Sequence, residues 1–589
     1  MANGFWNRVL RVDLTTGKTW EEHPDDSFYR KHVGGRGFIA HYLLKEVPAS
    51  VDAFSPDNRL IFMAGPVTGT PLPGAGRHSC GARSPLTGGF GESEAGGFWG
   101  AELKHAGYDG IVIQGKAAKP TYLHIDENTV ELRDASHLWG KRSGEVETTL
   151  RKDAGDRLLR VLQIGPGGEN LVRFACVIND LNEIAGRTGI GAVMGSKNLK
   201  AITVRGKKNV PMADPKRIRE VSQWVAKTMD EVHYNFHHYG TGAAMEGKHL
   251  EGHLIVKNFS EGTLPEVKQI DAIRLKEQYG QKMDGCYACS VRCKKRVKIE
   301  SAGVDPKYGG AEYETLGAVG TDLAVTDLVK ISVANQALNW WGLDSVSCGG
   351  TIAWAMECYD KGLITKEDTG GLELKWGDGD MLNKLIDMIA TRQGFGDVLA
   401  EGAARAAAKI GRGTDKYVVA VRGLEVAMHD PRAMENMKTN YPVNPTGGDH
   451  TGGAHARTSL RNTIGVCQFL QYDEQVTLDV LNASTGWGMS KEELNEVAER
   501  GLAMARLFNL RCGFTKADDK LPPRLMEPLK EGPFANKPFS TQDIVAVVEN
   551  YYKTRGWNVA DGVPTTDTLN KLGIKDYAEP VLAAPAPAS

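Results

Sequence analysis

Three closely spaced cysteines constrain this chain more than any other feature. Cys286, Cys289 and Cys293 follow one another in the spacing C-x2-C-x3-C. Thiols this close together, in a chain without export signals, are more typical of a soft-metal site than of disulfides. Three thiolates leave one position for a fourth ligand from elsewhere, in an iron–sulfur cluster or a structural zinc site. We expect a cluster, while zinc or a turn without metal remain alternatives.

A basic run follows the cysteines directly. Lys294, Lys295 and Arg296 would raise the reduction potential of a nearby cluster. They could also attract an acidic electron carrier. A solvated surface without a partner is the alternative interpretation.

Length and charge bound the class of protein. A chain of 589 residues is expected to form two to four domains. Its formal net charge of -2 argues against a nucleic acid or membrane surface held by bulk electrostatics. No apolar run approaches the length of a membrane span, and the first residues show no signal peptide. We therefore expect a cytoplasmic protein with reduced thiols.

The first two hundred residues are predicted to be mostly strands. An alternating segment over residues 10–14, a Thr-Thr-Gly-Lys turn and residues 19–22 predict an N-terminal hairpin. Few helical periods interrupt the further predicted strands, which are residues 60–64, 110–114, 122–125, 160–164, 172–178 and 201–204.

Glycine-rich blocks lie between these predicted strands. Gly34-Gly35-Arg36-Gly37 and the stretch 185–197 combine glycines with arginine. Backbone N–H groups and guanidinium groups suit phosphate oxygens. Neither block is a strict P-loop or a dinucleotide fingerprint, so a conventional nucleotide site is not expected.

From about residue 214 the pattern becomes helical. Residues 326–341 carry apolar side chains on one face, with Thr326 as a candidate N-cap and Gly342 as a C-terminal stop. Further helices are predicted over residues 381–390, 395–410, 491–507 and 541–555.

These patterns predict an α+β chain of three domains. A β-rich base is expected over residues 1–208, and a helical domain with the cysteine triad over 209–414. A helical C-terminal domain is expected over 415–589, and its Pro/Ala-rich end, residues 583–589, is predicted to be disordered.

Several motifs together resemble one family. They are Gly34-Gly35-Arg36-Gly37, Ser84-Pro85-Leu86-Thr87-Gly88, Ala185-Gly186-Arg187, Glu312-Tyr313-Glu314-Thr315 and Gly342-Leu343-Asp344. With the cysteine triad, and in this order, they resemble the tungsten-dependent aldehyde ferredoxin oxidoreductases from about residue 5 to residue 530.

The resemblance implies a β base and two helical domains that enclose a tungsten bis-pyranopterin cofactor. It also implies a [4Fe-4S] cluster and Mg²⁺ bridging the pterin phosphates. The tungsten would be held by sulfurs of the organic cofactor, so the protein fixes the cofactor and shapes the pocket. The implied reaction oxidises a small aldehyde to a carboxylic acid and passes electrons to ferredoxin or an iron–sulfur partner subunit, in a homo- or hetero-oligomer.

The same resemblance assigns roles to individual residues. Cys286, Cys289 and Cys293 match the clustered ligands, and Cys467 matches the fourth, with Cys512 as the competing candidate. The matching pterin, phosphate and magnesium contacts are Arg77, Glu94, Ala95, Gly96, Arg187, Thr188, Gly189, Asn339, Gly342, Leu343, Asp344, Asn462 and Val466.

This chain departs from the family pattern at three of those positions. Asn339 and Asn462 stand where aspartates lead the two pterin segments, and an amide still offers hydrogen bonds there but lacks the charge. Glu94 stands where an amide is expected, which bears on the magnesium site.

Catalysis is expected to involve Glu314, Tyr313 and His450. Glu314 matches the pocket carboxylate, and burial beside a cofactor is expected to raise its pKa and let it accept a proton. His450 matches a pocket histidine that donates a hydrogen bond to the substrate oxygen.

Two other functions remain open from the sequence. The catalytic subunit of a tungsten-type aryl-CoA (benzoyl-CoA) reductase would use the same cofactors, and Cys348 would then be a candidate near the metal. A non-catalytic, zinc-stapled binding protein is the alternative from another class.

Overall fold

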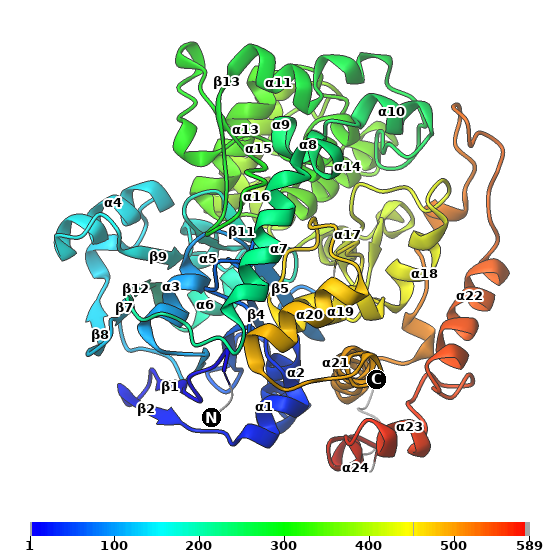
Figure 1. The fold of residues 1–589 in the computed structure, drawn as a ribbon. Helices are drawn as coiled ribbons and strands as arrows, with labels where there is room; N and C mark the ends of the chain where they lie inside the picture. The colour runs from blue at the N-terminus through cyan, green and yellow to red at the C-terminus, as the bar shows by residue number, and fades with distance from the viewer. Residues whose placement is uncertain (1–2, 452, 583–589) are drawn as a thin grey trace.

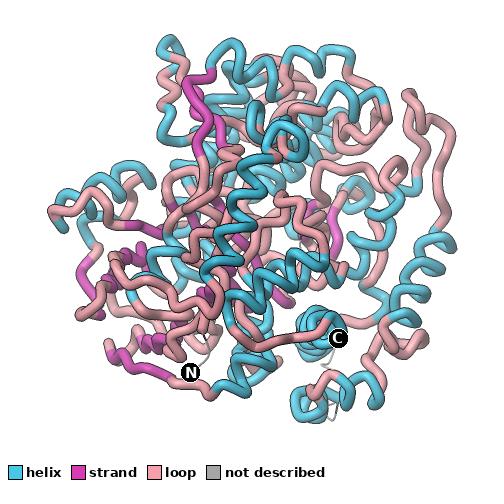
Figure 2. Tube along the Cα trace, in the orientation of Figure 1, coloured by secondary structure: helices cyan, strands magenta, loops and turns pink. Residues whose placement is uncertain are grey.

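The strands of this protein gather in its N-terminal third, and helices make up most of the rest. The computed structural model describes residues 3–451 and 453–582. Figure 1 shows the blue and cyan N-terminal segment as a base against which the later helices pack. In Figure 2 most strands lie in this base, and a separate strand pair lies at the top of the view. The predicted α+β class is therefore confirmed.

Two mixed six-stranded sheets form the base. The first has the order β2-β1-β6-β3-β4-β5, with β1 and β6 parallel. The second has the order β11-β10-β9-β12-β7-β8, with β7 and β12 parallel. The first sheet is built from β1 (Val9–Asp13), β2 (Lys18–Glu22), β3 (Leu60–Ala64), β4 (His78–Arg83), β5 (Phe90–Ala95) and β6 (Gly110–Gln114). The second is built from β7 (Thr121–Ile125), β8 (Val130–Asp134), β9 (Arg160–Gln163), β10 (Val177–Asn179), β11 (Glu183–Ala185) and β12 (Leu199–Val204).

One apolar cluster joins the two sheets. Phe62 and Ile111 from the first sheet and Leu162 and Ile202 from the second belong to it, together with Trp99. All five side chains are fully buried. Burial of this apolar surface is what stabilises the base.

The expectation of few helices before residue 208 is wrong. The base also contains α1 (Asp26–His32), α2 (Gly35–Glu46), α3 (Trp99–Ala106), α4 (Ser143–Ala154), α5 (Pro166–Glu169) and α6 (Ile190–Ser196). Nine residues of α2 are buried. A helix buried on nearly every side shows no amphipathic period, which is the signal that the prediction required. Two of the glycine blocks are consequently helix starts, since Gly34 and Gly189 are the N-caps of α2 and α6.

The predicted strand over residues 172–178 is also largely wrong. Only its end pairs in the sheet, as β10. Before that, the Val172 N–H donates to the Gly167 carbonyl and the Cys176 N–H to the Gly342 carbonyl. The segment contacts a helix end instead of a neighbouring strand, and periodicity cannot reveal such a partner.

The long helices of the second half follow the prediction closely. They are α13 (Leu328–Trp341), α15 (Gly379–Thr391), α21 (Lys491–Arg511) and α22 (Thr541–Thr554). Asp327, and not Thr326, caps α13, because its carboxylate accepts hydrogen bonds from two backbone N–H groups of the first turn.

The predicted helix over residues 395–410 is in fact two. Gly402, at φ 82°, separates α16 (Phe395–Leu399) from α17 (Ala403–Ile410). The predicted disordered tail, residues 583–589, lies outside the described residues. Among the helices that are described, none is long and apolar enough to cross a membrane.

Two helix ends meet the base in the same way. α13 ends at Gly342 and α19 (Ala456–Ile464) ends at Gly465, both left-handed at φ 75° and 77°. A Cβ on Gly165, just after β9, would lie 2.2 Å from the Trp341 carbonyl oxygen. A Cβ on Gly65, just after β3, would lie 2.1 Å from the Ile464 carbonyl oxygen. Each sheet thus approaches one helix end through a glycine.

Candidate active site

A polar cavity lies where the base meets the helical part of the chain. It encloses about 1230 Å³ of space not filled by atoms, including the part that opens to solvent. Its walls come from β5, the segment around β11, the segment 308–315, the start of α14 (Ser345–Asp360) and residues 449–451. Of the residues expected at the cofactor or in catalysis, those that line it are Arg77, Glu94, Ala95, Gly96, Arg187, Glu314, Asn339, Leu343, Asp344 and His450.

Other predicted cofactor residues lie behind these walls. Thr188 is buried, and its hydroxyl donates to the Glu92 carbonyl. Gly189 is held against Arg173, whose carbonyl oxygen would lie 2.0 Å from an added Cβ. Gly342 is the left-handed end of α13, and Val466 is buried in an apolar cluster. Asn462 is buried, and its amide nitrogen has no partner in the described part of the chain, so it retains a hydrogen bond to offer.

The cysteine triad lies in a hairpin turn next to the base. The turn joins β13 (Gly280–Asp284) to β14 (Lys294–Val297), which pair antiparallel. The Tyr287 N–H donates to the Gly97 carbonyl at 3.0 Å. Gly96 leaves room for a thiol, because a Cβ there would lie 2.7 Å from Cys286 Sγ. Backbone contacts with the base therefore position the triad.

Cys467 meets the triad from a distant part of the sequence. It lies three residues after Ile464, the last residue of α19, and its N–H donates to the Gly74 carbonyl at 3.0 Å. Burial raises the pKa of Cys289 and of Cys293, and the nearby Cys467 raises both further. Cys512 packs in a different apolar cluster, and its charged neighbours are Arg83 and Arg511. The structure thus brings Cys467, and not Cys512, to the triad.

Three charged side chains separate the thiols from the cavity. Arg77 lines the cavity, and its Nη1 lies 4.0 Å from Cys467 Sγ. Glu183 also lines it, with Oε1 3.7 Å from Cys286 Sγ. Lys294 lies in the same wall, 3.7 Å from Glu183 Oε2. A metal centre on the thiols would therefore lie one layer of side chains from whatever fills the cavity.

The alternative interpretation, in which Lys294 and Lys295 lie on a solvated surface, is wrong. Lys295 is buried and lies 3.8 Å from Glu312, and Lys294 pairs with Glu183. Burial alone would lower the pKa of Lys294, but Glu183 and Glu312 outweigh it and raise the pKa. Both lysines belong to β14 and meet carboxylates inside the protein. Their charge therefore acts on the thiols and not on solvent.

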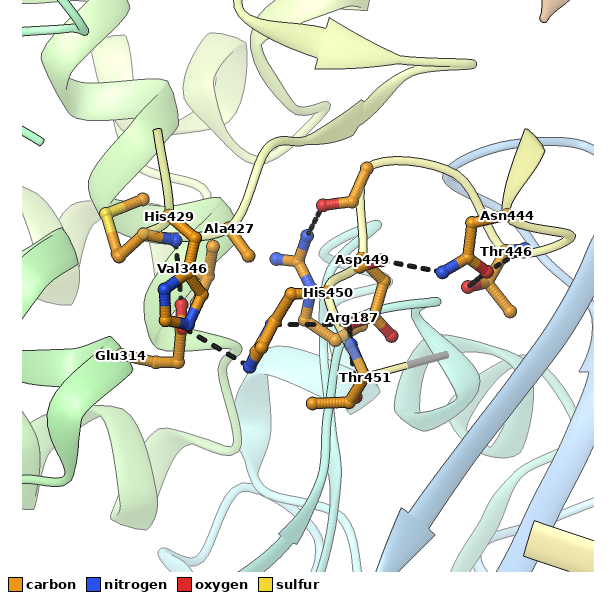
Figure 3. Close-up of polar contacts among 12 residues, drawn as sticks. Arg187, Glu314, Val346, Ala427, His429, Asn444, Thr446, Asp449, His450 and Thr451 are labelled. Atoms are coloured by element: carbon orange, nitrogen blue, oxygen red, sulfur yellow. Dashed lines mark hydrogen bonds and ion pairs between the residues drawn. The ribbon is translucent and has the colours of Figure 1, made fainter. Parts of the chain in front are cut away.

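A carboxylate and two imidazoles face one another in the opposite wall (Figure 3). Glu314 is in the first turn of α12 (Tyr313–Ala318). One of its oxygens lies 3.1 Å from His429 Nε2 and 3.3 Å from His450 Nε2. The other accepts a hydrogen bond from the Met428 N–H at 2.9 Å. The three possible ligand atoms lie within 4.8 Å of one another, so this group could also hold a divalent cation.

The pKa of Glu314 is lowered, contrary to the expectation that it is raised. Burial acts in the expected direction, but the charge of His450, the hydrogen bond from His429 and the Met428 N–H together outweigh it. Burial lowers the pKa of His429 to about 4, against the opposing effect of Glu314. Near neutral pH the pair is therefore an ionised carboxylate and a neutral imidazole.

Tyr313 supports this group from behind. Its hydroxyl donates to the Met428 carbonyl at 2.8 Å, and its ring stacks on His429 at a centroid distance of 4.9 Å. The phenol is therefore engaged with the backbone and does not point freely into the cavity.

The sequence reasoning missed His429, Glu183 and Glu312. His429 comes shortly after the short strand β16 (Leu424–Glu425), and a lone histidine there carries no signal. Glu183 and Glu312 become recognisable only through the lysines of β14 that they meet.

Arg187 joins the helical part of the chain to the base across the cavity. Its Nη1 lies 3.1 Å from the Asp344 carboxylate, which also caps α14. Its Nη2 donates to the Glu425 and Gly448 carbonyls. The Nε–H of this buried group has no partner among the described residues. Glu94 Oε1 is likewise buried and unpartnered, and burial together with Glu92 raises the pKa of Glu94.

Several cysteine thiols gathered beside a polar cavity are typical of redox proteins that place a metal cluster next to a second cofactor. The model of the aldehyde ferredoxin oxidoreductase N-terminal domain matches residues 9–206, and the model of domains 2 and 3 of that family matches residues 217–459 and 453–574. The chain belongs to the aldehyde ferredoxin oxidoreductase family.

Individual relatives cover nearly the whole chain. The tungsten-containing aldehyde ferredoxin oxidoreductase of Pyrococcus furiosus is 38% identical over an alignment of 611 positions, which covers 98% of this chain and 100% of that protein. The aliphatic sulfonate oxidoreductase, WOR-like subunit, of the same organism is 33% identical over 96% of each. Among solved structures, the active-site complex of a benzoyl-coenzyme A reductase with 1,5-dienoyl-CoA has a TM-score of 0.84 at 26% identity, covering 99% of each chain.

Proposed function

We propose that this protein oxidises aldehydes to carboxylic acids with a tungsten bis-pyranopterin, and that electrons leave through a [4Fe-4S] cluster on Cys286, Cys289, Cys293 and Cys467. The reaction is RCHO + H₂O → RCOOH + 2H⁺ + 2e⁻. Ferredoxin or an iron–sulfur partner subunit takes the electrons. The observation that carries the proposal is the single layer of Arg77, Glu183 and Lys294 between the four thiols and the cavity.

The residues of the cavity fit such a cofactor. The buried Nε–H of Arg187 and the buried Nδ2 of Asn462 have no partner within residues 3–451 and 453–582, which suits the oxygens and ring nitrogens of a polar ligand. Gly186 lines the cavity, and the nearest atoms to an added Cβ lie 3.6 Å away. Backbone and arginine donors at this position suit phosphate oxygens.

The two helix ends that meet the base would flank the pterins. Leu343 and Asp344 follow the end of α13 and line the cavity, and Asn462 and Val466 belong to the end of α19. Arg77 and Glu94 would lie near the pterin phosphates. A Glu94 carboxyl with a raised pKa would donate a hydrogen bond to phosphate while protonated, and would bind Mg²⁺ only when ionised.

When bound, the tungsten cofactor would accept two electrons from the substrate, and the cluster would carry them away one at a time. The protein's own groups would manage the protons. Glu314 is ionised near neutral pH and would accept a proton from the attacking water. His450 would donate a hydrogen bond to the aldehyde oxygen. His429 and Tyr313 would hold Glu314 in place, because His429 Nε2–H points at the carboxylate and Tyr313 stacks on the imidazole.

An aryl-CoA reductase is the second candidate function, supported by the likeness to the benzoyl-coenzyme A reductase complex. Cys348, the residue singled out for it, gives no further support. Its side chain is fully buried in α14 and does not line the cavity. A zinc-stapled binding protein, the third candidate, would leave the polar cavity without a role.

Elemental analysis of anaerobically purified protein, followed by an aldehyde panel with a viologen acceptor, tests the proposal. We expect tungsten, about four iron atoms per chain and activity on at least one aldehyde. Tungsten and iron with no activity on any aldehyde, but turnover of a dienoyl- or aryl-CoA, would select the second function. Zinc alone would select the third.

A further inference from the structure

Two neighbouring grooves open on the outer side of the cysteine turn. One is lined by parts of β13, β14, α4 and residues 180–181, and the other by the turn itself. They share Phe98, Lys282 and Asp284, so they form one continuous depression, which we call the cluster face. β13, labelled near the top of Figure 1, marks its position.

The floor of the cluster face is formed by the thiol-bearing turn. Cys286 and Cys289 line the second groove directly. Ala288 between them is exposed, in a left-handed conformation at φ 52° that turns the backbone outward. The thiols therefore have the cavity on one side and this depression on the other.

More basic than acidic side chains line the cluster face, although the whole chain carries a slight negative net charge. Three carboxylates line it, Glu147, Asp180 and Asp284. The basic side chains that line it are Arg151, Arg160, Lys282, Arg292, Arg296 and Lys307. The whole chain has a formal net charge of -2, so this balance is local.

The carboxylates of the face are already paired. Glu147 pairs with Arg151, and Asp180 lies 3.1 Å from Arg160. Asp284 is shared by Arg296 at 3.3 Å and Lys282 at 3.6 Å.

Arg292 and Lys307 pair with none of these carboxylates, but Lys307 lies 3.2 Å from Asp305, so Arg292 is the cation left over. It is exposed, and no carboxylate of the described residues lies within ion-pair distance of it. Its Cα and its side chain lie beside Gly285 in the same turn as the thiols. The excess positive charge is thus located next to the thiols, where a partner's acidic groups would meet it.

We propose that the cluster face is the docking surface for an acidic iron–sulfur electron-transfer protein, held chiefly by the charge of Arg292 and Lys282. The proposal rests on the proposed function, since it names the partner that accepts the electrons. Each docking event transfers one electron and reduces the partner's cluster by one electron. Two successive events restore the enzyme after each aldehyde is oxidised.

Charge reversal of these two side chains tests the docking surface. The double variant Lys282→Glu with Arg292→Glu changes exposed charges and removes no thiol. A matched control, Lys571→Glu with Lys575→Glu, makes the same change in charge on α23 (Thr566–Lys571) and α24 (Lys575–Leu582), at the bottom of Figure 1. Both are compared with the unmodified holoenzyme at equal iron content.

The acceptors are a purified ferredoxin of strongly negative charge and a small neutral dye. We expect KM for the ferredoxin to rise about tenfold or more in the cluster-face variant, with kcat on the dye unchanged and no change in the control. The affinity of the unmodified protein for ferredoxin is expected to fall steeply between 50 and 300 mM salt, because the Debye length is about 10 Å at 0.1 M.

Two results would overturn the docking surface. One is the same ferredoxin KM in the cluster-face variant and the control, and the other is a ferredoxin affinity that salt does not change. Absence of dye-coupled aldehyde oxidation in the unmodified holoenzyme would instead overturn the proposed function. In that event the dissociation constants of ferredoxin for the three proteins still decide whether this face docks it.

Discussion

Glu314 is only partly exposed and is yet ionised, because a backbone N–H and two imidazoles converge on its carboxylate. The Met428 N–H binds one oxygen, and two imidazoles lie 3.1 and 3.3 Å from the other. The other ring nitrogen of His429, Nδ1, has no partner among the described residues. The charge of His450, the hydrogen bond from His429 and the Met428 N–H keep Glu314 ionised, as a proton acceptor at neutral pH requires.

Replacement of Glu314 by Gln removes the base and preserves its shape. We expect tungsten and iron content to be kept and kcat for aldehyde oxidation to fall at least about 100-fold. Glu357→Gln is the matched control, because Glu357 is a buried carboxylate of α14 that pairs with Arg524 outside the cavity. That control is expected to lower the melting temperature and to leave kcat per tungsten unchanged. Full activity of the Glu314 variant would remove this residue from the mechanism.

The fourth cluster ligand can be decided by a pair of serine substitutions. Cys467→Ser should lower the iron content per chain and abolish the visible absorption of the cluster, because Cys467 lies beside the triad. Cys512→Ser should leave both unchanged, since that thiol packs elsewhere. Iron loss in the Cys512 variant with retention in the Cys467 variant would reverse the assignment.

At the scale of secondary-structure elements, two glycines of the base decide how closely the helices approach. Gly65 follows β3 and Gly165 follows β9, and each touches the end of one helix. The backbone of Gly165 is extended, with φ -84° and ψ -179°, so its requirement is steric and not conformational. The nearest atoms are backbone atoms, which cannot move aside as a flexible side chain can.

Gly165→Ala should therefore be severe. A Cβ 2.2 Å from the Trp341 carbonyl oxygen would force the end of α13 away from the base. We expect a loss of about 3 kcal/mol in the free energy of unfolding, measured by denaturant titration, together with reduced tungsten content. Gly247→Ala in α10 (Met245–Leu250) is the control, because nothing lies within 4 Å of its added Cβ. Equal stability of the two variants would show that the contact between Gly165 and the end of α13 is not rigid.

At the scale of the whole molecule, the C-terminal end of the chain packs against its N-terminal helices. Tyr577 of α24 meets the half-buried imidazole of His41 and the buried imidazole of His32, with its hydroxyl 2.6 Å from His41 Nδ1 and 3.2 Å from His32 Nε2. Burial lowers the pKa of His41 to about 4, with Lys45 adding to the effect. Burial also lowers the pKa of His32. Both imidazoles are therefore neutral in the folded protein near neutral pH.

Acid should loosen this contact. The pKa of His41 is lower in the folded chain than the ordinary value of 6.5, so the unfolded chain binds a proton first as pH falls. The stability contributed by the neutral imidazole is complete above about pH 6.5 and is lost toward pH 4. The loss reaches at most about 3 kcal/mol for His41.

Denaturant titrations between pH 7.5 and 4 measure that slope, and limited proteolysis at the same pH values reports on α24. His41→Gln should flatten the slope, whereas His137→Gln, at an exposed histidine, should not change it. The same slope in all three proteins would show that other groups control the acid response.

The sequence alone predicted elements whose signals are local. β3 and β6 and the helices α15, α21 and α22 were placed within a few residues, because alternation, amphipathic period and caps are properties of neighbouring residues. The buried helix α2 was missed because a helix surrounded by protein has no polar face. The position of the fourth thiol came from the family resemblance, since spacing cannot specify a ligand so far along the chain.

By itself, the sequence determined that three thiols lie together and that glycine lets backbone segments approach closely. Only the tertiary structure decided which carboxylates the basic side chains meet. Lys294 faces Glu183 instead of solvent, and His429 faces Glu314. The physical reason is that charge and protonation depend on burial and on partners distant in the sequence. A residue's type is local information, whereas its electrostatic environment belongs to the folded chain.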